Sequence, residues 1–175
     1  MQHLERAARW AQVAMGAALL LSGLIKVWEP VLFFWDVVPY TQLLGIRQGL
    51  FGLEQPWQLV SRAALLMAPL ECALGMALLA NWRPRWTMPA AVALMVFFIA
   101  LMVLAWRSGA TEECGCFGAL LNRSPGQAAV EDVVMLLLLL VGWWGVRRRA
   151  GWRRGGTLVA ASAVLAVLVT TVRFV

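Results

Sequence analysis

Long apolar stretches constrain the fold of this chain more than any other feature. They cover residues 10–28, 58–80, 86–106, 125–146 and 156–174. A helix needs about 20 mostly apolar residues to cross the hydrocarbon core of a bilayer. The pattern therefore predicts an all-α integral membrane protein, with a four-helix transmembrane bundle, a fifth C-terminal transmembrane helix and no room for a second domain within residues 1–175.

The composition agrees with a protein that lies in a lipid bilayer. Hydrophobic residues make up 62% of the chain and charged residues 14%, whereas soluble domains carry about 25% charged residues. The net charge of +6 does not indicate a nucleic-acid partner. The basic residues gather in short segments beside apolar stretches, which is typical of membrane proteins.

The arginines predict which side of the membrane each loop faces. One face receives Arg6 and Arg9, then Arg83 and Arg85, and then the five arginines of residues 147–154. Short arginine-rich loops stay in the cytoplasm. We therefore expect a bacterial inner-membrane protein with a cytoplasmic N-terminus, and two extracytoplasmic loops at residues 29–57 and 107–124.

The first of these loops is too polar, and too interrupted by Pro39 and glycines, to cross the bilayer. We expect it to lie along the outer interface, where aromatic side chains favour the headgroup region. The aromatic residues concerned are Phe33, Phe34, Trp35 and Tyr40.

The fourth apolar stretch has a readable start. Ser124 can cap a helix, Pro125 suits the first helical position, and Gln127 can complete a capping box. We predict a helix that begins at Pro125.

Cys114 and Cys116 in the second loop are the residues best suited to chemistry. Cysteines this close form either a strained disulfide, which is easily reduced, or two thiols poised for exchange. The neighbouring Gly115 and Gly118 permit the sharp turns that so small a ring needs. The pair indicates a thiol–disulfide oxidoreductase, and a disulfide that only rigidifies the loop is the alternative.

A soft-metal carrier for Hg, Cu or Zn is a further interpretation of these two thiols. Two sulfurs do not fill a tetrahedral site, and the single histidine, His3, falls on the predicted cytoplasmic side. We therefore predict no resident metal site.

Two charged residues fall within apolar stretches. Glu71 lies near the middle of the second stretch, two residues after Pro69, and an ionisable group at that depth needs a partner, a proton or a polar cavity. Lys26, near the end of the first stretch, is the opposite charge that we expect across the bundle. A functional role and a structural ion pair both fit this arrangement.

Three further residues are candidates for supporting roles. Cys72 next to Glu71 fits a small apolar filler, and the alternative is a relay thiol for Cys114 or Cys116. Glu131 and Asp132 fall in the second turn of the fourth stretch, where they could carry protons for thiol chemistry or anchor the helix at the interface.

Three motifs together resemble the MauE family of methylamine-utilisation membrane proteins, within the DoxX-like group. They are Gly23-Leu24-Ile25-Lys26 followed by Glu29-Pro30 and Phe33, then Pro69-Leu70-Glu71 with Gly75, and then Cys114-Gly115-Cys116-Phe117-Gly118. The resemblance covers residues 10–146. The chain is longer than the family pattern at residues 43–58 and has the extra fifth span.

The resemblance implies a four-helix membrane core that handles disulfides with an extracytoplasmic thioredoxin-like protein or cysteine-rich client. The residues of this chain that match the family motifs by position, and to which the resemblance extends this role, are Lys26, Glu71, Cys114 and Cys116. A membrane quinone is the electron acceptor that such chemistry could use. The alternative from another class is a non-catalytic assembly factor or a small subunit of a larger membrane complex.

Overall fold

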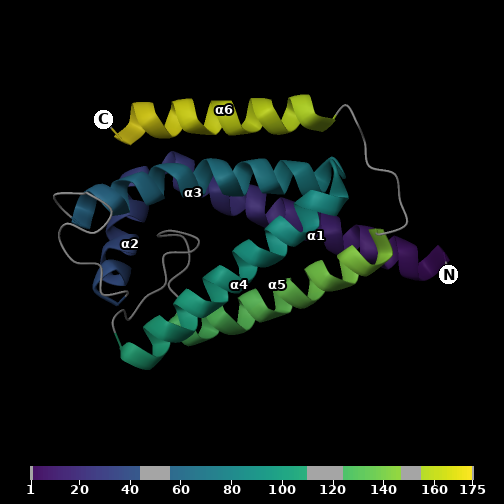
Figure 1. Ribbon diagram of the computed structural model, residues 1–175, viewed down its shortest axis with the longest axis horizontal. Coiled ribbons are helices and arrows are strands. Elements are labelled where there is room, and N and C mark those ends of the chain that lie inside the picture. The colour runs from purple at the N-terminus through teal and green to yellow at the C-terminus, as the bar shows by residue number, and fades with distance from the viewer. Residues whose placement is uncertain (1, 44–55, 110–123, 147–154, 175) are drawn as a thin grey trace.

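The computed structural model of this chain describes residues 2–43, 56–109, 124–146 and 155–174. These residues form helices and contain no strand. The helices, shown in Figure 1, are α1 Gln2–Trp28, α2 Pro30–Leu43, α3 Pro56–Leu79, α4 Pro84–Ser108, α5 Pro125–Val146 and α6 Gly155–Phe174.

The helices form a membrane bundle of the predicted class. By length and composition, four of the described helices can cross a bilayer, and they contain Glu5–Trp28, Pro84–Ser108, Pro125–Trp144 and Gly155–Arg173. Helix α3 contributes a shorter described apolar segment, Leu65–Leu79, and lies between α1 and α6. Helices α1, α3, α4 and α5 make the four-helix bundle, and α6 is the additional C-terminal helix.

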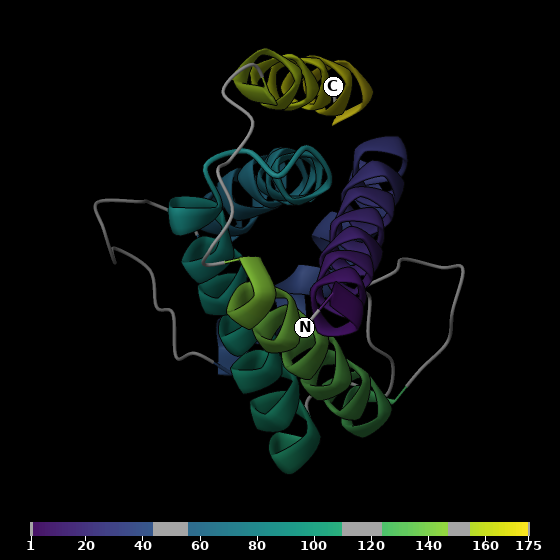
Figure 2. The same cartoon turned by 90° about the vertical axis from the view of Figure 1, so that its right-hand side faces the viewer.

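Neighbouring long helices along the chain run in opposite directions. Figure 1 places the N-terminus at one end of the bundle and the C-terminus at the other. Helix α1 packs against both α3 and α5, and α4 packs against α5. Helix α6 forms an outer layer against α3, as the view in Figure 2 shows.

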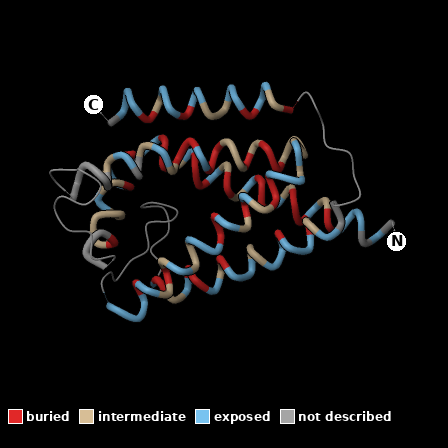
Figure 3. The backbone as a smooth tube through the Cα atoms, viewed as in Figure 1, coloured by how far each residue is buried: buried red, intermediate tan, exposed pale blue. Residues whose placement is uncertain are grey.

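Burial follows this arrangement, with inward faces buried and outward faces exposed (Figure 3). The exposed faces are apolar, as expected for helices whose solvent is lipid. Large exposed tryptophans stand near helix ends, where the indole favours the membrane interface. They are Trp28, Trp86, Trp106 and Trp144.

Glycines bring α1 and α3 into close contact. A Cβ atom on Gly75 would lie 2.6 Å from the backbone nitrogen of Leu20, and one on Gly16 would lie 3.0 Å from the carbonyl oxygen of Gly75. A Cβ on Gly23 would lie 2.8 Å from Sγ of Cys72. Small residues let helix backbones approach in a bilayer, where packing drives association.

A tight turn joins α3 to α4 at the end of the bundle near the N-terminus. Asn81 and Arg83 adopt left-handed backbone conformations, with φ of 49° and 40°. Nε2 of Gln12 donates hydrogen bonds to the Leu78 carbonyl at 2.7 Å and to Oδ1 of Asn81 at 3.2 Å. The side chain of Gln12 thus ties α1 to this turn, where the Leu78 carbonyl also accepts from the backbone N–H of Asn81 at 3.1 Å.

The described part of the first predicted outer loop contains a helix that the sequence did not predict, although this helix is not among those long enough to cross a bilayer. Pro39 lies inside α2, which continues to Leu43. Pro39 sits close to the C-terminal end of α2, so that few turns of this helix depend on the backbone N–H that proline lacks. Phe33 and Tyr40 are buried in the protein, while Trp35 remains exposed. Phe33 and Tyr40 thus pack α2 on the bundle, and the position of these rings at the level of the headgroups stays a prediction.

Candidate functional site

A buried ion pair joins the end of α1 to the middle of α3. Nζ of Lys26 lies 2.5 Å from Oε1 of Glu71, and the two residues are 3% and 0% exposed. Lys26 stands in the last turn of α1. The prediction that these two charges pair across the bundle is confirmed.

Ser22 is the third member of this polar cluster. Its Oγ donates to Oε2 of Glu71 at 2.8 Å and accepts from Nζ of Lys26 at 3.0 Å. Both carboxylate oxygens therefore have a donor, which is what a buried charge requires. Sequence reasoning missed Ser22, although its spacing of four residues from Lys26 places both on one face of α1.

Two aromatic rings surround the remaining side of the ammonium group. Nζ of Lys26 lies 5.1 Å from the ring centroid of Phe33 on α2 and 5.4 Å from that of Phe98 on α4. Both distances are within the range of a cation–π interaction. The cluster of Ser22, Lys26 and Glu71, called the polar triad below, thus sits where α1, α2, α3 and α4 meet.

Cys114 and Cys116 lie outside the described residues, but the helix ends on either side of them are described. Helix α4 ends at Ser108 with Gly109 in the left-handed conformation, φ 62°. Figure 1 shows the end of α4 and the start of α5 at the same end of the bundle as α2. Chain segment 110–123 therefore starts and finishes at this end.

The start of α5 has the predicted capping box. The backbone N–H of Gln127 donates to Oγ of Ser124 at 3.3 Å, and the backbone N–H of Ser124 donates to Oε1 of Gln127 at 3.2 Å. A Cβ on Gly126 would lie 3.3 Å from the indole of Trp106 on α4. The two helix ends beside segment 110–123 are therefore packed together, and the prediction of a helix from Pro125 is confirmed.

Comparison with known protein families matches residues 4–145 to the model of methylamine utilisation protein MauE. The chain belongs to the MauE family. The match includes the polar triad and the Cys114–Cys116 motif, and it ends before α6. No curated protein and no solved structure matches the chain.

Two carboxylates lie on α5 of this MauE-family chain. Asp132 is buried, at 8% exposed, and Glu131 is half-buried. Asp132 follows Ala128 by one turn, and Ala128 packs with Tyr40 and Met102 where α2, α4 and α5 meet. Asp132 thus projects from the same face of α5 that contacts α2 and α4.

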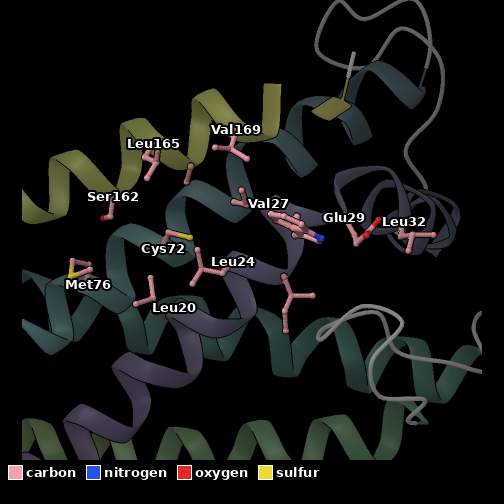
Figure 4. Close-up of a pocket in the computed structure, with 13 residues that line it drawn as sticks. Leu20, Leu24, Val27, Glu29, Leu32, Cys72, Met76, Ser162, Leu165 and Val169 are labelled. Atoms are coloured by element: carbon pink, nitrogen blue, oxygen red, sulfur yellow. The ribbon is translucent and has the colours of Figure 1, made fainter. Parts of the chain in front are cut away.

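Cys72 is almost fully buried, at 1% exposed, and faces α1 and α6. It packs with Val27, Ala68 and Ala166, as a small apolar side chain does. It also lines a groove of about 940 Å³ between α1, α3 and α6 (Figure 4). Helix α6, which the family match does not cover, closes one side of this groove.

Metal ligands do not gather in the described part of the chain. No group of three or more His, Cys, Asp and Glu side chains is placed there to hold a metal ion. The polar triad is a neutralised ion pair bridged by a hydroxyl group. Such an arrangement can hold helices in register and relay a proton, but it offers no free oxygen to bind a cation.

Proposed function

We propose that this chain is a membrane thiol–disulfide redox protein that exchanges disulfides through Cys114 and Cys116. One observation carries the proposal: the helix ends on either side of the Cys-Gly-Cys motif, those of α4 and α5, pack together at the bundle end where α2 lies. The partner is an extracytoplasmic thioredoxin-like protein or a cysteine-rich client, in a bacterial inner membrane. Membership of the MauE family fits a membrane protein with a redox or assembly role.

The exchange conserves atoms and electrons without a metal. A thiolate of the partner attacks one sulfur of the Cys114–Cys116 disulfide, forming a mixed disulfide and releasing the other sulfur as a thiolate. A second partner thiol then displaces the mixed disulfide, so that the partner leaves oxidised and the chain keeps two electrons and two protons. Repeated turnover passes these to a second acceptor, for which the proposal names a membrane quinone.

The carboxylates of α5 suit the proton transfers of this cycle. Glu131 and Asp132 follow the helix start at Pro125 by less than two turns and are the described carboxylates next along the chain from the cysteines. A partly exposed carboxylate can take up and release protons near the outer surface. The polar triad has a different part, which is to join α1 to α3 beside aromatic rings of α2 and α4.

The test is to trap the mixed disulfide in cells. Cys114→Ser and Cys116→Ser are each expressed in the full chain, and thiols are blocked with acid and a maleimide before non-reducing gel analysis. In each single variant the remaining thiolate can attack the disulfide of an oxidised partner and release one partner sulfur as a thiolate. The mixed disulfide then accumulates, because the chain lacks the second thiol that would displace the partner. The double serine variant forms none.

Cys72→Ala is the matched control, because it removes a buried thiol of the same chain. It leaves both the adducts and the oxidation of the partner unchanged. If both serine variants support full partner oxidation and no adduct forms in either, the redox proposal is rejected.

A non-catalytic subunit or assembly factor is the second candidate, and helix α6 favours it. The face of α6 turned away from α3 exposes Val164, Leu168 and Val172, and α6 lies outside the family match. Such a face could dock on a larger membrane complex. Purification in a fixed ratio with that complex, unchanged in the double serine variant, would support this reading over exchange.

A further inference from the structure

The groove between α1, α3 and α6 has the dimensions of a site for one lipid chain. Its volume of about 940 Å³ falls within the ~300–1,000 Å³ of ligand pockets. Along α1 it extends from Leu20 to Trp28, which at 1.5 Å per residue is about 12 Å. One leaflet of hydrocarbon is about 15 Å deep, half of a core of about 30 Å.

The wall of the groove is apolar along most of this length. Leucine and valine side chains from α1 and α6 line it, together with Met76 and Cys72 from α3. Figure 4 shows Met76 at one end, and Glu29 and Leu32 at the other. The floor has no charged group, which suits an acyl chain and excludes a polar ligand at depth.

Among the described residues, charges of both signs stand at one end of the groove. The guanidinium carbon of Arg173 lies 4.2 Å from the ring centroid of Trp28, which lines the groove. Glu29, also at this end, is exposed. An exposed cation and an exposed anion at the end of a one-leaflet groove match a headgroup that carries a phosphate and a primary ammonium.

We propose that this groove binds one phospholipid with an ethanolamine headgroup, its acyl chain between α1, α3 and α6. Arg173 donates to the phosphate, and Glu29 accepts hydrogen bonds from the ammonium group. A glycerol headgroup would offer Glu29 only neutral hydroxyl donors and no cation, and a choline headgroup has no N–H to donate. The inference does not depend on thiol chemistry.

The test is lipid retention by the purified full chain. The detergent-solubilised protein is incubated with equal amounts of dioleoyl phosphatidylethanolamine, phosphatidylglycerol and phosphatidylcholine, and bound lipids are counted by native mass spectrometry. The unmodified chain retains one phosphatidylethanolamine in preference to the other two. Glu29→Gln lowers the ratio of ethanolamine to glycerol lipid about threefold to tenfold, as expected for one partly solvated charge-assisted contact.

Matched variants separate the site from general detergent effects. Arg173→Gln lowers total retention, whereas Arg107→Gln, an exposed arginine at the same bundle end, does not. Ala166→Phe fills the groove and removes the lipid, whereas Ala161→Phe on the exposed face of α6 keeps it. Glu29→Gln and Arg173→Gln, at the charged end of the groove, keep the test valid if Ala166→Phe fails to fold, because both change exposed side chains.

Three results would overturn the proposal. They are retention of no lipid, equal or better retention of phosphatidylglycerol or phosphatidylcholine by the unmodified chain, and recovery of a quinone from the groove in place of a phospholipid. The last result would leave the redox function standing, because it would identify the acceptor. Failure of disulfide trapping would in turn leave the lipid site untouched.

Discussion

At the scale of single residues, the polar triad shows how a charge is kept inside a membrane bundle. Glu71 is fully buried, yet its two oxygens accept from Lys26 and Ser22. The ammonium group also faces the rings of Phe33 and Phe98. The charges of Lys26 and Glu71 neutralise each other inside the bundle, so that neither side chain has to reach solvent.

This arrangement predicts that single and double variants of the pair differ in stability. Glu71→Leu leaves the Lys26 ammonium buried without its counter-charge and is expected to destabilise the protein by about 3–5 kcal/mol. Lys26→Met combined with Glu71→Leu removes both charges and recovers most of this loss, since an apolar pair of similar volume packs in their place. The measurement is thermal unfolding in detergent, with Arg107→Gln as the exposed control.

If the double variant is as unstable as the single one, packing and not charge compensation dominates at this site. Ser22→Ala tests the hydroxyl alone. It leaves one oxygen of Glu71 without its donor, and the expected loss is about 1–3 kcal/mol.

At the scale of elements, the contact between α1 and α3 depends on glycine. Gly75 faces the backbone of Leu20, and Gly23 faces Cys72. This close approach brings Lys26 on α1 within reach of Glu71 on α3. The helix pair and the ion pair therefore depend on one another.

Gly75→Ala is expected to separate the two helices. The added Cβ would lie 2.6 Å from the Leu20 nitrogen, a backbone atom that cannot rotate away, so that overpacking destabilises by about 1–3 kcal/mol. Gly142→Ala is the control, because its nearest atom lies at 3.3 Å. Thermal unfolding compares the two variants, and equal unfolding midpoints would show that α1 and α3 can move apart freely.

At the scale of the whole molecule, the bundle has two unlike ends. One end holds α2 and the helix ends beside segment 110–123, while the polar triad joins the end of α1 to the middle of α3. The other holds the N-terminus and the tight turn at Arg83. Helix α6 adds a fifth crossing, which puts the C-terminus at the α2 end.

Reporter fusions test how these ends face the membrane. Alkaline phosphatase fused after Val175 is expected to be active, because the α2 end would face the extracytoplasmic side by the arginine distribution. The same enzyme fused after Val146 is expected to be inactive, because α5 ends at the opposite side of the bundle. The reverse pattern would invert the topology and place the Cys114 motif in the cytoplasm.

The sequence by itself determined the membrane class, the helix start at Pro125, the family and the pairing of Lys26 with Glu71. These follow from local physics: apolar length, helix capping, and the scarcity of opposite charges within apolar stretches. Only the tertiary structure decided the parts played by Ser22, Phe33 and Phe98, and the helical course of α2 through Pro39. It also decided the groove, because a space between three helices depends on where α6 packs, and no local pattern encodes that position.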